Sequence, residues 1–265
     1  MKNLVKLATL LITVVLVIAL FGGCNKKPGY SVATNAQFKP FEYTDGSGNI
    51  IGLDVDLVND VAKHAGFTAT MKDMEFDAVV PSVQTGASDM GAAGLTITDS
   101  RKQNVDFSDP YYISHQEVIV KAGDAMASLT TADQVNAALA GKTIGVCTGF
   151  TGVDYVQGST DEGYVGIANA TVKQYDNIGL AITDLKNGQV DAVVMDDIPA
   201  KQAASADVNK SAVVVVDVPL TDEEYGIAVK KGNTDLLDKI NAAITQFKSD
   251  GTLDQLVEKW ITNAQ

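Results

Sequence analysis

The residues best suited to bind a ligand lie around Arg101, the only arginine in a chain with 20 Lys and Arg residues. A guanidinium offers a rigid fork of donors that matches a carboxylate, whereas a lysine ammonium is a single charged point. The apolar run 90–95 predicts a buried strand, and the polar residues 96–100 are typical of a helix start. Because open α/β folds bind ligands just beyond the ends of strands, we predict an anion site here. The alternative is one stray arginine among surface lysines.

A second candidate site follows from an internal correspondence. The segments VQTGASDMGAA at 83–93 and LKNGQVDAVV at 185–194 both run from a helix end through Gly, two residues and Asp into an apolar strand. Gly86 and Asp89 recur as Gly188 and Asp191, 102 residues later. This spacing indicates two similar units, although glycine is common enough at helix ends for a chance match.

The two units lead to opposite charges. The first strand leads to Thr96 and Arg101, and the second leads to Asp196 and Asp197. If the units are lobes that face each other, a guanidinium on one wall opposes carboxylates on the other. A ligand that suits both walls carries a carboxylate and an ammonium, as a free amino acid does. Between closed lobes the effective dielectric falls, and each charge-assisted hydrogen bond contributes about 1.5 to 3 kcal/mol.

Strand and helix signals alternate along the chain, which predicts an α/β fold. Apolar residues recur with helical spacing over 53–65, and Gly66 supplies a helix stop. Further helices are predicted over 76–83, 131–140, 234–248 and 252–260, and further strands at 118–120, 143–146, 191–195 and 213–216. Thr131 and Gln134 have the spacing of a capping box.

The first residues have the pattern of a secretory signal. Lys2 and Lys6 precede an apolar run at 7–21, which would be about 22 Å long as a helix, short of the roughly 30 Å that a bilayer requires. The run ends in FGGC at 21–24, which resembles a bacterial lipobox, where the cysteine is lipidated after cleavage. We therefore expect a signal peptide at 1–23, a lipidated Cys24 with a tether at 24–29, and attachment to the outer face of the cell membrane. A plain signal peptide with an incidental cysteine is the alternative.

Composition limits the partners and the architecture. The formal net charge is −13, so nucleic acid is not an expected partner. With Cys24 used by the anchor, only Cys147 remains, and no internal disulfide can form. The 265-residue chain is 46% hydrophobic, which suffices for one large domain or two ordinary ones.

Seven segments, in this order, resemble the family 3 extracellular solute-binding proteins, the polar amino-acid receptors of ABC importers. They are ATNAQFKPFEY (33–43), GLDVDLVNDVAK (52–63), AGLTITDSRKQNVDFSDPYY (93–112), GKTIGVCTGFTGVDY (141–155), DAVVMDDIPA (191–200), YGIAVKKGN (225–233) and DGTLDQLVEKW (250–260). The resemblance implies a type II periplasmic-binding-protein fold, in which two α/β lobes are joined by two crossover strands with the ligand cleft between them. Lobe 1 would comprise residues 30–114 and 221–265, and lobe 2 residues 115–220.

The resemblance also implies a wall that binds the carboxylate of the ligand. Arg101 would be its clamp, and Thr96 with the backbone around Ala93 and Gly94 would complete it. Thr151, in the loop GVCTGFTG at 145–152, would lend a hydroxyl and an amide to the same carboxylate. Because that loop opens a helix, its free amides and dipole suit an anion.

The remaining roles concern the ammonium and the side chain of the ligand. Asp197 matches the aspartate that holds the α-ammonium in the family, with Asp196 beside it. Phe38 and Phe76 match the aromatic pair that sandwiches the side chain of the ligand, which for a basic side chain adds a cation–π contribution of about 0.5 to 2 kcal/mol.

Selectivity for the side chain depends on positions where this chain departs from many relatives. Asn35 stands where relatives that hold basic or amide ligands have an aspartate, although Asp196 could compensate. Cys147 stands where several relatives have lysine, glutamine or leucine, and it is either a pocket group or a small buried residue. The resemblance therefore implies a polar amino acid, with glutamine or another neutral side chain first and arginine, lysine or histidine next.

A dehydratase-like enzyme or a surface adhesin on the same fold are the alternative functions. The carboxylate pair Asp196 and Asp197 could do acid–base chemistry, but no Ser-His-Asp arrangement or phosphate-binding glycine loop accompanies it. His64 and His115 fall in separate predicted elements and form no metal cluster. We expect no cofactor, no metal and no catalytic residue, and we expect a monomer that delivers its ligand to an ABC permease.

Overall fold

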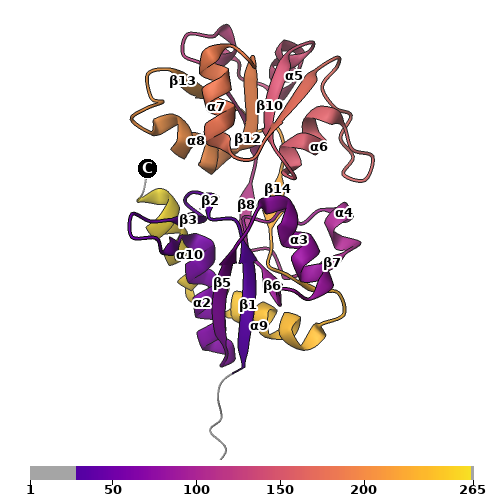
Figure 1. Cartoon of the computed structure of the whole chain (residues 1–265), viewed down its shortest axis with the longest axis vertical. Helices are drawn as coiled ribbons and strands as arrows, with labels where there is room; N and C mark the ends of the chain where they lie inside the picture. Colours follow the sequence, from indigo (N-terminus) through magenta and orange to yellow (C-terminus); the bar gives the residue numbers. More distant parts are fainter. Residues whose placement is uncertain (1–27, 264–265) are drawn as a thin grey trace, which may run out of the picture.

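The computed structural model describes residues 28–263, which form two five-stranded sheets with helices packed against them (Figure 1). The first sheet has the order β5 (Thr68–Asp73), β1 (Gly29–Thr34), β6 (Met90–Gly91), β15 (Ala228–Lys230) and β7 (Val105–Phe107). The second has the order β11 (Thr171–Tyr175), β10 (Thr143–Cys147), β12 (Ala192–Asp196), β9 (Gln116–Lys121) and β13 (Val213–Val216). In each sheet the strands at one edge are parallel, and the strand by which the chain enters from the other lobe, β15 in the first sheet and β9 in the second, pairs antiparallel beside them.

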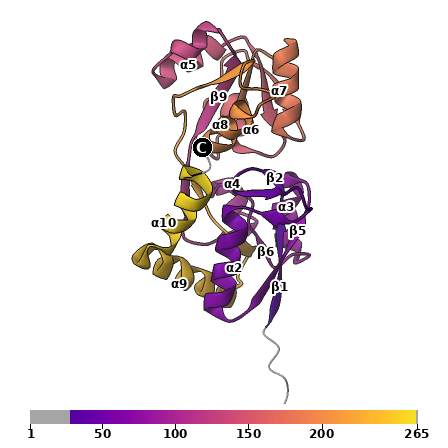
Figure 2. The same cartoon turned by 90° about the vertical axis from the view of Figure 1, so that its left-hand side faces the viewer.

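Helices cover both sheets. The first lobe contains α2 (Leu53–Ala65), α3 (Phe76–Thr85), α4 (Asp99–Lys102), α9 (Thr234–Asp250), α10 (Thr252–Val257) and the π-helical turn Glu258–Thr262, together with a small sheet of β2 (Gln37–Phe38), β3 (Glu42–Thr44) and β4 (Ile50–Ile51). The second contains the 3₁₀ turn Ala125–Ser128, α5 (Ala132–Leu139), α6 (Thr151–Gln157), α7 (Ile178–Asn187) and α8 (Asp197–Ser205). Figure 2 shows α9 and α10 beside α2 on one side of the first lobe.

Local sequence accounts for the helix that was predicted over 53–65. Leu53, Leu57 and Val61 recur every four residues and are almost fully buried against the first sheet. Gly66 ends the helix in the left-handed conformation, with φ at 78°, and its N–H donates to the carbonyl of Ala62. A residue with a side chain is strained in that conformation, so the glycine stops the helix where the sequence predicted.

The internal correspondence has the same structural role in both lobes. Gly86 ends α3 and Gly188 ends α7, both in the left-handed conformation. Asp89 then accepts the N–H of Ser31 on β1 at 2.7 Å, and Asp191 accepts the N–H of Thr143 on β10 at 2.8 Å. Each aspartate therefore ties the start of its own strand to a neighbouring parallel strand.

Two short strands connect the lobes. β8 (Tyr112–Ser114) and β14 (Glu223–Tyr225) pair antiparallel as a separate ribbon between the two large sheets (Figure 1). The predicted fold class, two α/β lobes joined by two crossover strands, is confirmed.

Some predicted segment boundaries need correction, and others fall outside the described residues. The run 90–95 is a strand only at Met90–Gly91, because the chain then turns and the carbonyl of Leu95 accepts from Gly226 near the connecting ribbon. Gly29, which was assigned to the tether, is the first residue of β1. The signal peptide at 1–23, Cys24 and the tether up to residue 27 lie outside the described residues. Among residues 28–263, no helix is both long and apolar enough to cross a membrane.

Candidate ligand-binding site

Arg101 lies between the lobes and contacts both. It belongs to the single turn of α4, where the Thr98 hydroxyl accepts its N–H and caps the turn. Its Nη1 donates to the carbonyl of Thr96 at 2.7 Å, and its Nη2 donates to the carbonyl of Gly149 in the second lobe at 3.0 Å. The guanidinium carbon lies 5.4 Å from the centre of the Phe76 ring. Within the described part of the chain no carboxylate lies within 4.0 Å of the guanidinium, so its charge is not neutralised by an ion pair.

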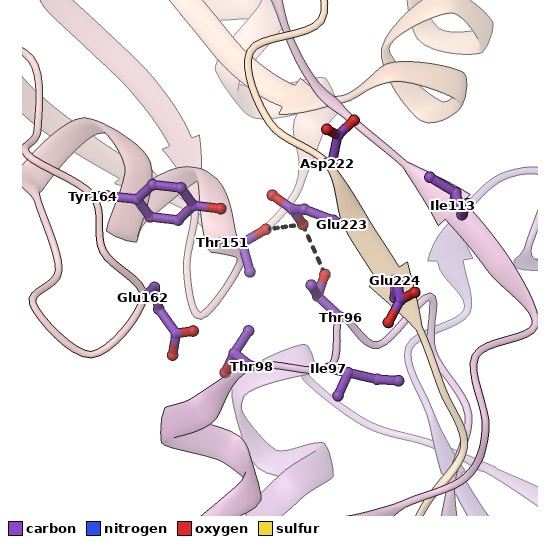
Figure 3. Close-up of a pocket in the computed structure, with 10 residues that line it drawn as sticks. All are labelled: Thr96, Ile97, Thr98, Ile113, Thr151, Glu162, Tyr164, Asp222, Glu223 and Glu224. Carbon is purple, nitrogen blue, oxygen red and sulfur yellow. Dashed lines mark hydrogen bonds between the residues drawn. The ribbon is translucent and has the colours of Figure 1, made fainter.

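Two hydroxyls from opposite lobes converge on one carboxylate oxygen. Thr96 donates to Oε2 of Glu223 at 2.9 Å, and Thr151 donates to the same oxygen at 2.7 Å (Figure 3). Both threonines and Glu223 are buried, and all three line a cavity of about 460 Å³ at the junction of the lobes. The junction of the lobes thus places both hydroxyls within hydrogen-bonding distance of one carboxylate.

Gln116 and Thr221, which lie next to the two crossover strands, orient Thr151 and Glu223. The side-chain amide of Gln116 donates to the Thr151 hydroxyl at 3.2 Å, which leaves the hydroxyl proton for Glu223. Thr221 accepts the N–H of Gln116 at 2.8 Å and donates to Oε1 of Glu223 at 3.1 Å. The hydroxyls of Thr151 and Thr221 are therefore fixed in their roles as donors to Glu223.

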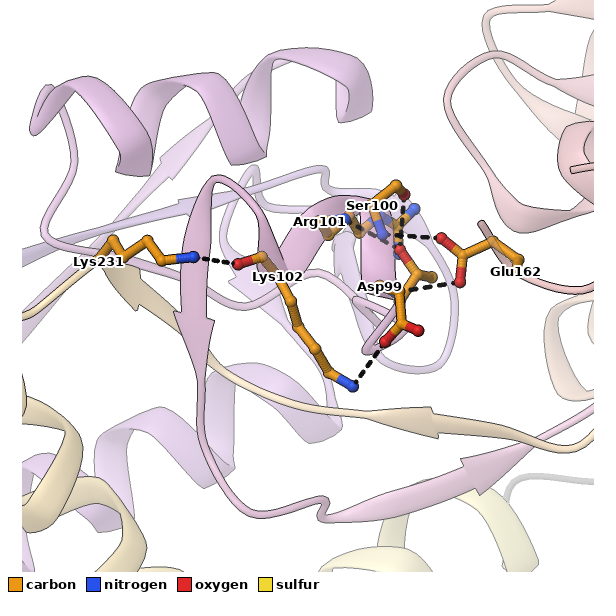
Figure 4. A network of polar contacts seen from close by, with 7 residues as sticks. Asp99, Ser100, Arg101, Lys102, Glu162 and Lys231 are labelled. Carbon is orange, nitrogen blue, oxygen red and sulfur yellow. Dashed lines mark hydrogen bonds and ion pairs between the residues drawn. The ribbon is translucent and has the colours of Figure 1, made fainter. Parts of the chain in front are cut away.

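Glu162 makes a further contact between the lobes. Its carboxylate accepts the N–H groups of Asp99 at 3.1 Å and Ser100 at 3.0 Å, at the start of α4 (Figure 4). Although partial burial opposes the shift, the hydrogen bonds from Ser100 and Asp99 hold the pKa of Glu162 below its ordinary value. Lys102 pairs with Asp99 at 3.2 Å on the outer side of the same turn.

Asp196 and Asp197 have different partners, because one ends a strand and the other begins a helix. Asp196 accepts the hydroxyl of Tyr225 at 2.6 Å, and Asp197 accepts the hydroxyl of Ser114 at 2.9 Å. Burial, followed by the negative charge of Glu223, raises the pKa of Asp196. The charge of Asp196 acts in turn on Arg101 and Cys147. Both aspartates are therefore bound to the connecting ribbon, Asp196 to Tyr225 of β14 and Asp197 to Ser114 of β8.

Three aromatic rings meet between the lobes. The Phe150 ring, from the loop before α6, lies 4.2 Å from the Phe76 ring and 5.5 Å from the Phe38 ring, between centroids. All three rings are buried. A side chain sandwiched between Phe38 and Phe76 would therefore have to displace Phe150.

A buried carboxylate supports the wall at Gly94. Asp54 accepts the N–H of Gly94 at 2.8 Å and the hydroxyl of Tyr111 at 2.7 Å, and burial raises the pKa of Asp54 to about 6. Gly94 has φ at 53°, and a Cβ atom there would lie 2.4 Å from the Phe38 ring. Only glycine fits this turn, which lets the chain pass directly behind Phe38. The neighbouring Ala93 is fully buried.

The two positions assigned to selectivity are both buried. The side-chain amide of Asn35 donates to the carbonyl of Met74 at 2.8 Å. Burial, and after it the charge of Asp196, raises the pKa of the Cys147 thiol to about 12, so the thiol is neutral at physiological pH. Within residues 28–263 no group of three or more His, Cys, Asp or Glu side chains could hold a metal ion.

Sequence reasoning missed two residues at the centre of this site. Phe150 stands directly before Thr151 in a segment that was already singled out, and its aromatic type beside a predicted ligand loop was the available signal. Glu223 lies in the second crossover, in the stretch TDEE that resembles an ordinary acidic surface loop. Nothing in the local pattern distinguishes Glu223, which is 3% exposed, from its exposed neighbours.

A two-lobed fold with polar groups converging from both sides defines a cleft-type ligand-binding protein. Over residues 30–263 the chain matches the bacterial extracellular solute-binding proteins, family 3, and it belongs to this family.

Relatives and solved structures agree with that assignment. A probable histidine-binding protein of Neisseria gonorrhoeae is 35% identical over 231 residues, which cover 87% of this chain and 82% of the relative. An ancestral arginine-binding protein bound to arginine is 38% identical with a TM-score of 0.76, over 89% of this chain and 99% of that one. An ancestral arginine-binding protein bound to glutamine is 39% identical with the same TM-score, over 88% and 98%. An ancestral amino-acid-binding protein described as a precursor of cyclohexadienyl dehydratase is 33% identical, with a TM-score of 0.73 over 88% and 95%.

Proposed function

We propose that this protein is the extracytoplasmic amino-acid-binding component of an ABC importer, which captures a free polar amino acid by closing its two lobes. The observation that carries the proposal is the convergence of Thr96 and Thr151, from opposite lobes, on a single carboxylate oxygen. The unpaired guanidinium of Arg101 lies at the same junction and supplies the charge that a ligand carboxylate requires.

In this proposal the α-ammonium of the ligand is held on the second lobe by Asp196. The motif favoured Asp197, and both aspartates are bound to the connecting ribbon, but the charge of Asp196 interacts with those of Glu223 and Arg101, at the end of the cleft assigned to the ligand carboxylate. An ammonium at Asp196 would also offset the repulsion between Asp196 and Glu223.

The groups beside Phe76 favour a ligand with a positively charged side chain. A cavity of about 230 Å³ opens there, and Glu75, Asp77, Thr148 and Asp176 line it together with Phe76. Three carboxylates around one cavity attract a cation by charge. We therefore rank arginine, lysine and histidine before glutamine and other neutral polar amino acids. Asn35 and Cys147 would contact the same end of the ligand.

The remaining parts of the proposal follow from family membership and the N-terminal sequence. The partner is the permease of an ABC transporter, which would receive the amino acid from the closed protein. The lipid anchor at Cys24 would keep the protein at the outer face of the cell membrane. We infer a monomeric binding protein rather than an enzyme, because a binding function requires only the opposed groups described above.

A thermal-shift panel tests the proposal. Ligand-stripped protein is melted with each of the twenty amino acids at one concentration, since a ligand that binds only the folded state raises the melting temperature. We expect the largest shift with a cationic amino acid and a smaller shift with glutamine. The matched decarboxylated amines should give none, because they lack the group that Arg101 holds. A panel without any shift would contradict the binding function, and chemical change of the amino acid during incubation would favour the dehydratase alternative.

A further inference from the structure

In the proposed function, the hydroxyls of Thr96 and Thr151 bind the carboxylate of the ligand. In the structure both hydroxyls already donate to Glu223. Thr96 and Thr151 both donate to Oε2 of Glu223, at 2.9 and 2.7 Å, across the junction of the lobes. A hydroxyl carries one proton and can donate to one acceptor at a time. Neither hydroxyl can therefore donate to Glu223 and to a ligand carboxylate at the same time.

The position of Glu223 in the connecting ribbon explains how it reaches both lobes. Successive residues of a strand point to opposite faces, so Glu223 and Tyr225 are buried in β14 while Glu224 between them is exposed. Thr221 donates to the second oxygen of Glu223 at 3.1 Å. The buried carboxylate is thus held by three hydroxyls, and no basic side chain of the described residues forms an ion pair with it.

We propose that Glu223 is an internal competitor for the carboxylate of the ligand. In the unliganded protein it links Thr96 to Thr151 and holds the cleft closed, and an entering amino acid must displace it. This inference rests on the proposed function, since it takes the two threonines as groups that bind the ligand. Because the self-closed state reduces the fraction of protein able to accept a ligand, the apparent affinity is lower than the open cleft would give.

The first arm of the test uses unliganded protein and small-angle X-ray scattering. Glu223→Gln keeps the shape of the side chain and removes its charge, and Glu223→Ala removes the contact entirely. We expect both variants to have a larger radius of gyration than the wild type and to become compact when L-arginine is added. Glu224→Gln, which removes the same charge from the exposed side of the strand, is the matched control and should remain compact. Equal radii for the unliganded wild type and both Glu223 variants would overturn the proposal.

The second arm measures affinity by calorimetry with L-arginine, L-glutamine and agmatine, which is arginine without its carboxylate. We expect Glu223→Gln to bind each amino acid about five- to tenfold more tightly than Glu224→Gln does, because a charge-assisted hydrogen bond no longer has to be exchanged. Agmatine lacks the carboxylate that Arg101 and the two threonines would hold, so it should show no measurable binding to either variant. Unchanged or weaker amino-acid binding in Glu223→Gln would contradict competition.

The two arms separate this inference from the proposed function. Should neither amino acid bind the wild type, the proposed ligand class fails, but the scattering comparison still decides whether Glu223 closes the lobes. Circular dichroism and the melting temperature show whether each variant is folded, and the conservative Glu223→Gln keeps the test valid if Glu223→Ala unfolds.

Discussion

The two lobes use the same unit of helix, glycine, aspartate and strand, but the ends of the two strands differ. In the first lobe Asp89 ties β6 to β1, and in the second Asp191 ties β12 to β10. Beyond β6 the first lobe presents the guanidinium of Arg101, and at the end of β12 the second presents the carboxylate of Asp196. The scaffold is thus repeated while the charge is inverted, and the proposed binding of a zwitterion requires both lobes.

Replacing the cationic wall should have the largest effect on binding. Arg101→Lys keeps the charge but removes the planar fork, so we expect the affinity for L-arginine to fall about 30-fold or more, measured by calorimetry. Lys102→Gln, on the outer side of the same turn, is the control and should change affinity less than twofold. Equal affinity of wild type and Arg101→Lys would contradict the clamp.

Replacing the acidic wall should have the next largest effect and should separate two adjacent aspartates. We expect Asp196→Asn to weaken binding of L-arginine about tenfold, because the ammonium loses its charged partner. Asp197→Asn should change it less than threefold while leaving the protein folded, since Ser114 can still donate to the amide oxygen. If calorimetry shows a larger loss of affinity for Asp197→Asn than for Asp196→Asn, Asp197 is the residue that binds the ammonium.

Ligand affinity should also depend on pH through the same carboxyl group. The pKa of Asp196 is raised, by burial and then by Glu223, so Asp196 is protonated at a pH where an ordinary aspartate is charged. Since the ammonium requires the charged form, affinity should be full above the raised pKa and decline as pH falls through it, by at most about tenfold per unit for one proton. Titrations with L-arginine between pH 8 and pH 5 should show this slope.

Asp196→Asn is the control for that slope. Four other titratable groups interact with Asp196 through their charges: Glu42, Glu223, Cys147 and Tyr225. A slope that persists in Asp196→Asn would assign the proton to one of these groups instead.

The repeated aspartates should affect stability and leave binding almost unchanged. Asp89→Ala removes bonds to the N–H and the hydroxyl of Ser31 from a half-buried site, so we expect a loss of about 2 kcal/mol in the free energy of unfolding. Asp191→Ala removes one bond at an exposed site and should cost about 1 kcal/mol. Urea denaturation measures both values. Equal losses would mean that the two units are energetically equivalent despite their different burial.

Much of the fold was predictable because its signals are local. The helix at Leu53–Ala65 and its stop at Gly66 depend on residues within a few positions of one another. The strand predicted at 90–95 was too long, because its second half contacts the connecting ribbon, more than 120 residues away in the chain. Periodicity reports what a segment buries, and it does not report which distant segment covers it.

The candidate site was likewise predictable only where its signals are local. Arg101, Thr96 and Thr151 were predicted from motifs, and the structure brings the two threonines together through one oxygen. Asp196 and Asp197 could not be ranked from the motif, since adjacent residues diverge only where β12 ends and α8 begins. Phe150 was visible in its motif, but its position between Phe38 and Phe76 depends on how the lobes meet.

The sequence by itself determined the class of the fold, the repeated unit and the opposite charges of its two ends, because each depends on residue types at short spacing. Only the tertiary structure decided what fills the cleft between those ends. Glu223 lies 127 residues from Thr96 and 72 from Thr151, and its contact with both exists only because the second crossover passes between the lobes. A hydrogen bond requires an approach within about 3 Å, and at such separations in the chain only the folded path of the backbone provides it.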